Sequence, residues 1–529
     1  MKTTRRQFIK SVGLGTVTLA FPNLISTRCA AAKQPNILFI MSDDHAEQAI
    51  SCYGSQLIET SHIDRIAHEG IRFENSFVTN SICAPSRAVL LTGKYSHMNG
   101  LRDNQDEFDG SQMTFPKLLQ QAGYQTAMIG KWHLKTDPTG FDEWKILIDQ
   151  GEYYNPTLIE NGVRNEYIGY TTDLITDIAV ESLNRRDRNR PFCMLVHHKA
   201  PHRNWMPNLK YLDVYNDRDL PLPETFYDDY ADRQAAKEAD MRIDDMYLSS
   251  DMKLNTGYYE KETGTGGNLA SAPFAEMGWA ASLARLTETQ RKAWDAHYDR
   301  INEEFRDLKL TGDDLLRWKY QRYIKDYLSC ILSVDESVGR LLEYLDEEGL
   351  NDNTLVVYTS DQGFYLGEHG WYDKRFMYEE SLGMPLVMRY PDQMKSNRVS
   401  EKMVLNLDFA PTFLDFAGVE IPVEMQGESL RAITSGNGQG EWRDSIYYHY
   451  YEYPHGWHNV KRHYGVRTER YKLIHFYYDI DTWELFDLQR DPNELNNLYD
   501  DPDYTDIVNT LKTELERLQQ KYGDTDIRI

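Results

Sequence analysis

The sequence predicts an α/β fold with a large, mainly parallel sheet covered by helices on both faces, followed by a smaller C-terminal α+β domain with an antiparallel sheet. Short apolar runs of strand length alternate with longer helical patterns through most of the chain, which is the order expected of parallel strands joined by helices. A chain of 529 residues also exceeds a single ordinary core. From about residue 436 the pattern changes to aromatic, alternating strands, so we expect a main domain over 33–435 and a second over 436–529.

Strands are expected where apolar or aromatic runs are bounded by turn residues. In the main domain these runs are 35–41, 71–78, 124–129, 192–197, 354–358 and 385–390. In the C-terminal domain they are 446–451, 464–467 and 471–476.

Helices are expected where apolar residues recur every three or four positions. These segments are 63–69, 115–121, 174–184, 320–348, 407–416 and 504–521. The polar, tyrosine-rich stretch 203–314 breaks the alternation, and we interpret it as an insertion at the rim of a site, with a helix near 288–308.

The composition excludes some partners. The formal net charge is −25 and the pI is about 5.0, which argues against nucleic acid and against a basic membrane-binding surface. Five cysteines at irregular spacing indicate neither a disulfide framework nor a zinc site. An anionic ligand would have to be attracted by a local basic pocket, because the field of the whole protein repels it.

Residues 1–32 have the pattern of an export signal. Arg5 and Arg6 lie in a twin-arginine-like motif, an apolar stretch covers 12–24, and alanines at 30–32 offer a cleavage region. The apolar stretch is too short for a transmembrane segment. We expect an exported, periplasmic protein, with the Sec or Tat route left open. A lipid anchor on Cys29 is the alternative, although Arg28 fits a lipobox badly.

Polar side chains follow four of the predicted strands. They are Asp43 and Asp44 after 35–41, Lys131 and His133 after 124–129, Lys199 and His202 after 192–197, and Asp361 and Gln362 after 354–358. Open α/β sheets bind their ligands at the carboxyl ends of the strands. The sequence therefore predicts that these side chains form one site.

The segment 81–93 places a cysteine at the start of a short apolar helix. Pro85 suits the first helical turn, where its missing N–H costs nothing. Arg87 follows Cys83 by four residues, so one helical turn can bring its guanidinium beside the cysteine. Free N–H groups and the dipole at a helix N-terminus favour an anion. We therefore expect an oxyanion to bind beside residue 83.

The run C-A-P-S-R at 83–87, followed by L-L-T-G at 90–93, resembles the signature C-x-P-S-R-x-x-x-L-T-G of the type I sulfatases, members of the alkaline phosphatase-like superfamily. The resemblance covers about residues 35–500. It implies that a maturation enzyme oxidises Cys83 to formylglycine, whose hydrate is the nucleophile. An isolated cysteine is more often an inert buried thiol, but the complete motif and its partners elsewhere in the chain favour the catalytic interpretation.

The acidic and amide residues at two strand ends indicate a metal site. Asp43, Asp44, Asp361 and Gln362 offer hard oxygen ligands, which suit calcium or magnesium rather than zinc. The resemblance implies one Ca²⁺ held by these four residues and by the oxidised Cys83. Many members of the family have asparagine where this chain has Gln362, which offers the same amide oxygen on a longer arm.

The resemblance also assigns roles to the basic residues. Arg87 orients the nucleophile, Lys131 and Lys374 clamp the sulfate, and Lys199 gives a supporting contact. His133 partners the formylglycine hydroxyl, and His202 is the acid for the departing sugar oxygen, a role suited to the histidine pKa. Taken singly, each residue is typical of a solvated surface; together they reproduce the order of the family.

The stretch 364–380 is similar to bacterial exported sulfatases that act on glycans, including relatives of the N-acetylglucosamine-6-sulfatase type. We therefore expect hydrolysis of 6-O-sulfate esters on N-acetylglucosamine residues of glycosaminoglycans or mucin-type glycans. The expected sugar contacts are Glu368, His369, Trp371, Arg375 and His463, with Trp457 and Arg467 as further candidates.

Three alternatives remain open. The enzyme could act on another sulfated sugar position, or hydrolyse phosphonate or phosphate monoesters, since phosphonate hydrolases can share the cysteine motif. The chain shows no extra histidines for a two-zinc phosphatase. The third alternative is a non-catalytic protein that binds sulfated glycans, against which stands the presence of every expected catalytic residue.

Overall fold

The structure is a computed structural model, which describes residues 34–255, 272–436 and 440–525. These residues belong to one compact unit that spans 34–529. The predicted export signal at 1–32 lies outside the described residues. Among the helices of the described segments, none is long and apolar enough to cross a membrane.

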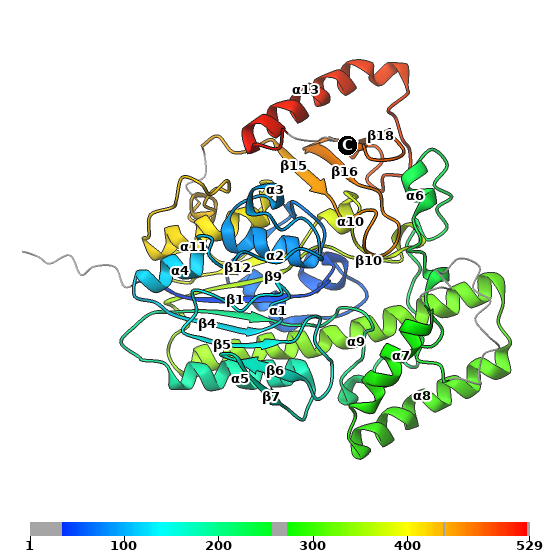
Figure 1. Ribbon diagram of the computed structural model, residues 1–529, viewed down its shortest axis with the longest axis horizontal. Coiled ribbons are helices and arrows are strands. Elements are labelled where there is room, and N and C mark those ends of the chain that lie inside the picture. The colour runs from blue at the N-terminus through cyan, green and yellow to red at the C-terminus, as the bar shows by residue number, and fades with distance from the viewer. Residues whose placement is uncertain (1–33, 256–271, 437–439, 526–529) are drawn as a thin grey trace, which may run out of the picture. The chain divides into compact units, whose positions relative to one another are not determined.

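Within the described residues, ten strands form the main sheet, in the order β13-β2-β12-β9-β1-β8-β4-β5-β6-β7 (Figure 1). The five consecutive strands from β9 to β5 are parallel, while β12, β6 and β7 pair antiparallel with their neighbours. The bounds are β1 Asn36–Ser42, β2 Ile71–Phe73, β4 Gln125–Gly130, β5 Glu143–Leu147, β6 Thr157–Glu160, β7 Val163–Glu166, β8 Phe192–His197, β9 Thr354–Ser360, β12 Leu386–Arg389 and β13 Arg398–Ser400.

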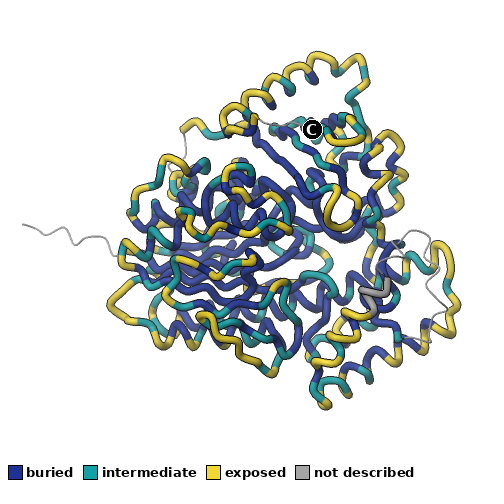
Figure 2. Tube along the Cα trace, viewed as in Figure 1, coloured by how far each residue is buried: buried dark blue, intermediate teal, exposed yellow. Residues whose placement is uncertain are grey.

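The central strand β1 is buried on both faces (Figure 2). Its side chains alternate, so Phe39 packs into one hydrophobic core and Leu38 and Ile40 into the other. A strand covered on both faces reads as a continuous apolar run, which explains why the sequence predicted it well.

Helices cover both faces of the sheet. One core contains residues of α1 (Ser61–His68), α5 (Thr171–Arg185) and α9 (Gly312–Glu347), and the other contains residues of α2 (Cys83–Thr92), α4 (Phe115–Gln121) and α11 (Phe409–Ala417). Figure 1 shows α5 and α9 on the opposite side of the sheet from α4 and α11. The predicted α/β class with a mainly parallel sheet is confirmed.

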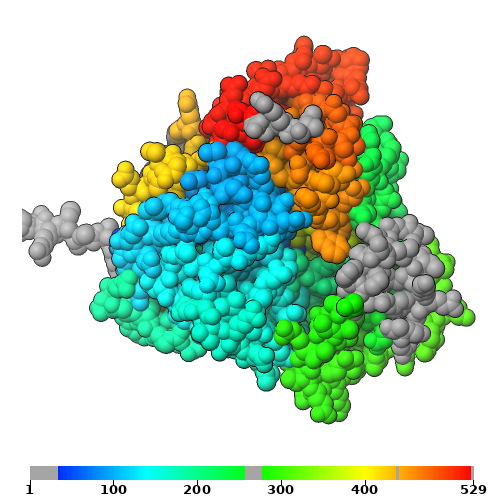
Figure 3. Space-filling view, in the orientation of Figure 1, coloured from blue at the N-terminus to red at the C-terminus, as the bar shows by residue number. Residues whose placement is uncertain are grey.

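The C-terminal residues form a second, antiparallel sheet. Its strands are β15 Ser445–Tyr450, β16 His463–Thr468, β17 Tyr471–Phe476 and β18 Thr482–Asp487, followed by α13 Thr505–Tyr522. Leu511, Leu515 and Leu518 of α13 share the core of the α2 face. In Figure 3 these orange and red residues lie against the blue residues of the main sheet region. The predicted C-terminal α+β architecture is confirmed, and the boundary at 435/436 stays a prediction.

The structure adds elements that the sequence did not predict. Strand β5, the antiparallel edge strands β6 and β7, and strand β18 are short and partly polar, so they lack the apolar run of a central strand. The insertion contains α6 Gln234–Glu238, α7 Ala272–Ala284 and the predicted helix α8 Glu288–Leu308. Strand β3 Ser76–Phe77 lies within the expected strand 71–78, which the structure divides into β2 and β3. The remaining short helices and strands are β10 Tyr365–Leu366, β11 Tyr372–Asp373, β14 Val404–Leu405, α3 Ser96–Asn99, α10 Glu379–Leu382 and α12 Arg431–Thr434.

Candidate active site

The parallel strands β1 and β9 end at the same level, since Ser42 pairs with Ser360. The residues that follow them therefore meet at one edge of the sheet. The backbone N–H of Asp44 donates to Oδ1 of Asp361 over 3.2 Å. Carboxylate oxygens of Asp43, Asp44 and Asp361 lie within 4.8 Å of one another, and all three residues are buried. Strand register thus brings together acids more than 300 positions apart.

Helix α2 brings Cys83 to this cluster. Ile82 is extended and Cys83 is the first helical residue, with Pro85 in the first turn. The Sγ atom lies 3.4 Å from Oδ1 of Asp43 and 3.8 Å from Nε2 of Gln362. Burial raises the pKa of the Cys83 thiol. The unmodified side chain is therefore a neutral thiol at neutral pH, not an activated thiolate.

Arg87 links helix α2 to the residues that follow strands β9 and β4. Its Nη2 donates to Oδ2 of Asp361 at 2.8 Å, and its Nη1 donates to the backbone carbonyl of Lys131 at 2.8 Å. The guanidinium is almost fully buried. A fork of fixed donors suits such bidentate bridging, so Arg87 holds Asp361 in place beside residue 83.

Two lysines neutralise the carboxylates. Lys374 Nζ lies 2.7 and 2.8 Å from the two oxygens of Asp44. Lys131 pairs with Asp43 and also donates to Oε1 of Gln150 at 2.5 Å. Burial alone would lower the pKa of Lys374, but the charge of Asp44 raises it well above its ordinary value. Both predicted sulfate clamps are therefore brought to the cluster.

The two predicted histidines also lie here. His202 Nε2 is 3.8 Å from Oδ2 of Asp44, and its Nδ1 is 2.8 Å from the carbonyl of Arg203. A carbonyl only accepts, so Nδ1 carries the hydrogen and Nε2 faces the cluster. His133 is buried with its Nδ1 unpartnered among the described residues. Burial, and then the charge of Lys131, lower the pKa of both rings well below the ordinary value.

Lys199 is the remaining basic residue that was predicted for the site. Its Nζ lies 4.9 Å from the centre of the Tyr153 ring, a cation–π contact. Burial, followed by repulsion from Lys131, lowers the pKa of Lys199 to about 8. The lysine is therefore cationic at neutral pH but close to its titration range.

The donors at the two strand ends fit a hard divalent cation. Asp43, Asp44 and Asp361 offer carboxylates, and Oε1 of Gln362 is buried without a hydrogen-bond partner in the described part of the chain. Burial raises the pKa of Asp44 to about 6 and that of Asp361 to about 7, so ionising all three needs compensating positive charge. Calcium and magnesium take carboxylate and amide oxygens of this kind.

Cys83, His202 and Lys374, which contact the carboxylate cluster, line a cleft of about 800 Å³. The predicted residues that line this cleft are Cys83, His133, Lys199, His202, Lys374, Arg375 and Trp457. Arg375 is held by Asp373, whose Oδ1 lies 3.1 Å from its Nε, and by Glu452. The structure therefore brings the predicted nucleophile, the predicted acid and the clamp Lys374 to one cleft, and the clamp Lys131 reaches the same cluster through Asp43.

Two of the predicted sugar contacts are core residues instead. Trp371 is fully buried and stacks between Tyr230 and Phe376, with ring centroids 5.2 and 4.9 Å away. His369 is also fully buried, and its Nδ1 lies 2.7 Å from Oδ2 of Asp228. Neither lines the cleft. The expectation that they contact sugar is corrected, because the hairpin that carries them turns their rings into the core.

The expected sugar contacts Glu368 and His463 are also corrected, because both side chains bond within the fold and neither lines the cleft. Glu368 accepts the backbone N–H of Leu366 at 2.6 Å, and this bond closes the hairpin turn. His463 is fully buried in β16 and accepts the N–H of Met377 at 3.1 Å. Arg467, a further candidate, pairs with Glu379 outside the cleft. These three side chains stabilise the fold around the site.

Several cleft residues were missed from the sequence. Gln150, Tyr153, Arg203, Asp373, Glu452 and His458 line the same cleft. Asp373 could have been found from its position beside Lys374. Gln150 and Glu452 lie in loops without a motif, and only the tertiary fold brings them here.

A mainly parallel sheet with acids at two adjacent strand ends, and a helix that starts at a cysteine beside them, defines a hydrolase of the alkaline phosphatase-like fold. The family model described as "Sulfatase" matches residues 35–419, and the model "N-sulphoglucosamine sulphohydrolase, C-terminal" matches residues 367–521. The chain belongs to the sulfatase family and is a sulfuric ester hydrolase.

Known relatives agree with this assignment. The chain is 51% identical over 501 residues to an N-acetylglucosamine-6-O-sulfatase of Bacteroides thetaiotaomicron, covering 93% of this chain and 88% of the relative. It is 26% identical to the human N-acetylglucosamine-6-sulfatase, covering 80% of this chain and 68% of the relative. One similar solved structure holds its substrate, D-glucosamine-2-N,6-O-disulfate, with a TM-score of 0.87, 50% identity, and coverage of 93% and 99%.

The fold is shared more widely than the activity. A phosphonate monoester hydrolase of Agrobacterium radiobacter has a TM-score of 0.63 at 19% identity, covering 92% of this chain and 96% of that one. This likeness concerns the fold alone.

Proposed function

We propose that this enzyme is exported and hydrolyses 6-O-sulfate esters on glucosamine-type residues of glycosaminoglycans or mucin-type glycans. The observation that carries the proposal is the meeting of Cys83 with Asp43 and Gln362, in a cleft that Lys199 and Lys374 also line. The 51% identity to an N-acetylglucosamine-6-O-sulfatase supports the sugar and the position. The similar solved structure that holds D-glucosamine-2-N,6-O-disulfate as its substrate supports the same sugar and the same sulfate position.

The proposal includes two groups beyond the standard side chains. A maturation enzyme oxidises Cys83 to formylglycine, and one Ca²⁺ is held by Asp43, Asp44, Asp361, Gln362 and residue 83. The hydrated aldehyde supplies a nucleophilic hydroxyl, and the ion supplies positive charge to the sulfuryl oxygens. Support comes from the family membership and from the oxygen donors that meet beside Cys83.

The basic side chains hold the sulfate ester for attack. Lys131 and Lys374 lie beside the carboxylate cluster with their ammonium groups buried. Fixed positive charge in a water-poor site stabilises the negative charge that develops on the sulfuryl oxygens. Arg87 keeps Asp361 in position and so orients residue 83. Lys199 adds a cation at the wall of the cleft.

The histidines move the protons. Nε2 of His202 faces the cleft, while its Nδ1–H is held by the carbonyl of Arg203. An anionic ester beside this ring favours its protonated form, which then donates to the departing O6 of the sugar. His133 lines the same cleft as residue 83 and would take the proton of the second hydroxyl, which would allow sulfate to leave.

Parallel assays test the reaction class and the sugar. Turnover should be measured on an aryl sulfate and an aryl phosphate, and on glucosamine and galactose derivatives sulfated at defined positions. We expect cleavage of the sulfate and a preference for the 6-sulfates of glucosamine and N-acetylglucosamine. A preference for phosphate would reject the reaction, and a preference for another sulfated position would reject the sugar.

Mass spectrometry of the peptide around Cys83 tests the non-catalytic alternative. An aldehyde at residue 83 in protein from its own host supports the enzyme. A thiol in such protein would support a sulfated-glycan binder. Protein produced without the maturation system is not informative, because it retains the thiol for a different reason.

A further inference from the structure

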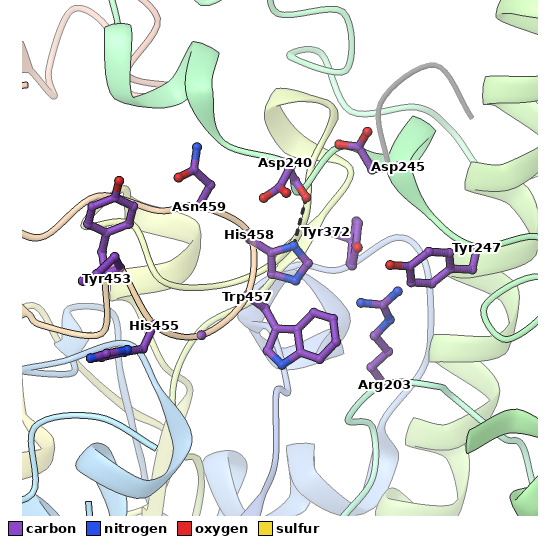
Figure 4. A pocket seen from close by; sticks show the side chains of 12 residues that line it. Arg203, Asp240, Asp245, Tyr247, Tyr372, Tyr453, His455, Trp457, His458 and Asn459 are labelled. Carbon is purple, nitrogen blue, oxygen red and sulfur yellow. Dashed lines mark hydrogen bonds between the residues drawn. The ribbon is translucent and has the colours of Figure 1, made fainter. Parts of the chain in front are cut away.

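A second, smaller pocket of about 180 Å³ adjoins the cleft. It lies between the insertion, from Arg203 to Tyr247, and the C-terminal loop 453–459 (Figure 4). Residues that line both the pocket and the cleft are Arg203, Tyr247, Gly456, Trp457 and His458. The pocket therefore opens beside the cleft that holds the sulfate clamps.

His458 connects the loop 453–459 to two other segments that surround the pocket and the cleft. Its Nδ1 donates to the backbone carbonyl of Asp240 at 3.0 Å, the dashed line in Figure 4, and its carbonyl accepts the N–H of Asp240 at 3.1 Å. Its Nε2 lies 3.2 Å from Oδ2 of Asp373. Asp373 directly precedes the sulfate clamp Lys374. The pocket is therefore fixed in position relative to the reacting sulfate.

Trp457 presents an aromatic face at the boundary of the pocket and the cleft. It is 55% exposed, although its neighbour His458 is buried. Figure 4 shows the indole beside both His458 and Arg203. The face of an aromatic ring carries partial negative charge and attracts C–H groups, which sugar rings present on their apolar faces. Aromatic side chains with a few polar groups are the usual lining of ligand pockets.

The charges of the pocket select against an anion. Asp240 and Asp245 both line it. The guanidinium of Arg203 is already held by Asp251, with Nε and Nη2 at 2.8 and 2.6 Å from its two oxygens. A sugar that carries a carboxylate or a second sulfate would meet the two acids without a free cation from Arg203.

Asp240 offers a hydrogen-bond acceptor instead. Its Oδ1 is buried and has no partner among the residues that the structure describes. A carboxylate only accepts hydrogen bonds, and the terminal torsion of aspartate is soft. A small rotation can therefore present an oxygen to a ligand hydroxyl, and a neutral sugar supplies several such donors.

We propose that this pocket binds the sugar next to the 6-sulfated glucosamine, and that it accepts an uncharged, hydroxyl-rich sugar in preference to a uronate or a sulfated sugar. Trp457 stacks on the ring of this second sugar and Asp240 accepts one of its hydroxyls. The inference rests on the proposed function and narrows it. It favours glycans with neutral neighbours, as in mucin-type chains, over uronate-containing glycosaminoglycans.

The test compares kcat/KM on 6-sulfated N-acetylglucosamine with kcat/KM on disaccharides that add a neutral hexose or a uronate. Each neighbour is attached at the anomeric carbon or at O4, so that either direction of binding is covered. The unmodified enzyme should prefer the neutral disaccharide. Equal rates on the monosaccharide and both kinds of disaccharide would overturn the inference.

Two variants locate the effect. Trp457→Ala should lower kcat/KM on the neutral disaccharide about fivefold more than on the monosaccharide, in line with one aromatic contact. Asp240→Asn removes the charge at constant size and should reduce the preference for the neutral over the uronate neighbour. Tyr227→Ala is the matched control, because Tyr227 is 53% exposed and lines neither space.

The outcomes separate the two proposals. Loss of activity on every substrate alike in Trp457→Ala, with an unchanged preference in Asp240→Asn, overturns the subsite. Absence of turnover on 6-sulfated N-acetylglucosamine by the unmodified, matured enzyme overturns the proposed function instead. Melting temperatures of all variants show whether each one folds.

Discussion

The Sγ atom of Cys83 lies 3.4 Å from Oδ1 of Asp43, although 40 positions separate the two residues. The contact joins the start of helix α2 to the end of strand β1. It places the residue expected to carry the nucleophile directly against the acids expected to hold the cation. The predictions below follow from this arrangement and from the residues that surround it.

Replacing Cys83 with alanine is expected to lower kcat/KM at least about 10³-fold, as the loss of a nucleophile does in other hydrolases. The fold should survive, because the side chain is small. The measurements are turnover of a sulfated monosaccharide and the melting temperature. Cys52→Ala is the matched control, since Cys52 is half-buried and outside the cleft. Substantial activity in Cys83→Ala would reject the role of residue 83.

Removing divalent cations with a chelator is expected to lower both activity and melting temperature, and calcium should restore both. The carboxylates of Asp43, Asp44 and Asp361 lie within 4.8 Å of one another, so a bound cation favours the folded state. Calcium at a hundredfold its Kd would stabilise by about 2.7 kcal/mol.

The control for the calcium effect is Gln362→Leu, which removes the amide oxygen at similar size. This variant should need more calcium for the same rise in melting temperature. If calcium did not change the melting temperature of either the unmodified enzyme or Gln362→Leu, this result would contradict a cation at this site.

The sequence predicted the parts of the site that follow from local pattern. The apolar runs before Asp43 and Asp361 mark buried parallel strands, and their shared exit edge follows from the topology. Cys83 and Arg87 were found because a helix start and a motif coincide there. Trp371 and His463 were misassigned because a one-dimensional pattern does not distinguish an aromatic residue that packs in the core from one that faces a ligand. Glu452 reaches the cleft only through the tertiary fold.

The corrected position of Trp371 leads to a separate prediction. Trp371→Ala is expected to lower the free energy of unfolding by about 3–5 kcal/mol, because the ring is buried between Tyr230 and Phe376. The KM of the protein that remains folded should stay near that of the unmodified enzyme. Denaturant unfolding and steady-state kinetics at low temperature measure the two effects. A raised KM with unchanged stability would instead restore Trp371 as a sugar contact.

Lys199 is expected to set an alkaline limit on activity. Burial, and then the charge of Lys131, lower its pKa to about 8, so the ammonium loses its proton as the pH rises through that value. If the cation helps to bind the sulfate ester, kcat/KM should fall above about pH 8. Lys199→Arg keeps the charge at all accessible pH values and should move this limit upward. An unchanged alkaline limb in the variant would assign it to another group.

Asp524, which follows helix α13, is expected to stabilise the packing of this helix on the C-terminal sheet. Its Oδ2 accepts from the hydroxyl of Tyr447 and from Nδ1 of His449, both at 2.7 Å. Burial alone would raise the pKa of Asp524, but the hydrogen bond and the charge of His449 hold it well below the ordinary range. Asp524→Asn should therefore cost about 1–3 kcal/mol at neutral pH.

The effect of Asp524→Asn on the free energy of unfolding should depend on pH. A carboxyl whose pKa is lower in the folded state stabilises the fold above its unfolded pKa, near 4, and this stability is lost as the pH falls toward the folded pKa. The difference in unfolding free energy between the unmodified enzyme and Asp524→Asn should therefore shrink from pH 7 to pH 3. Asp503→Asn, at an exposed position before the same helix, is the control and should show little difference at any pH. If the difference in unfolding free energy between the unmodified enzyme and Asp524→Asn stayed constant over this range, the ionisation of Asp524 would not be the source of the stabilisation.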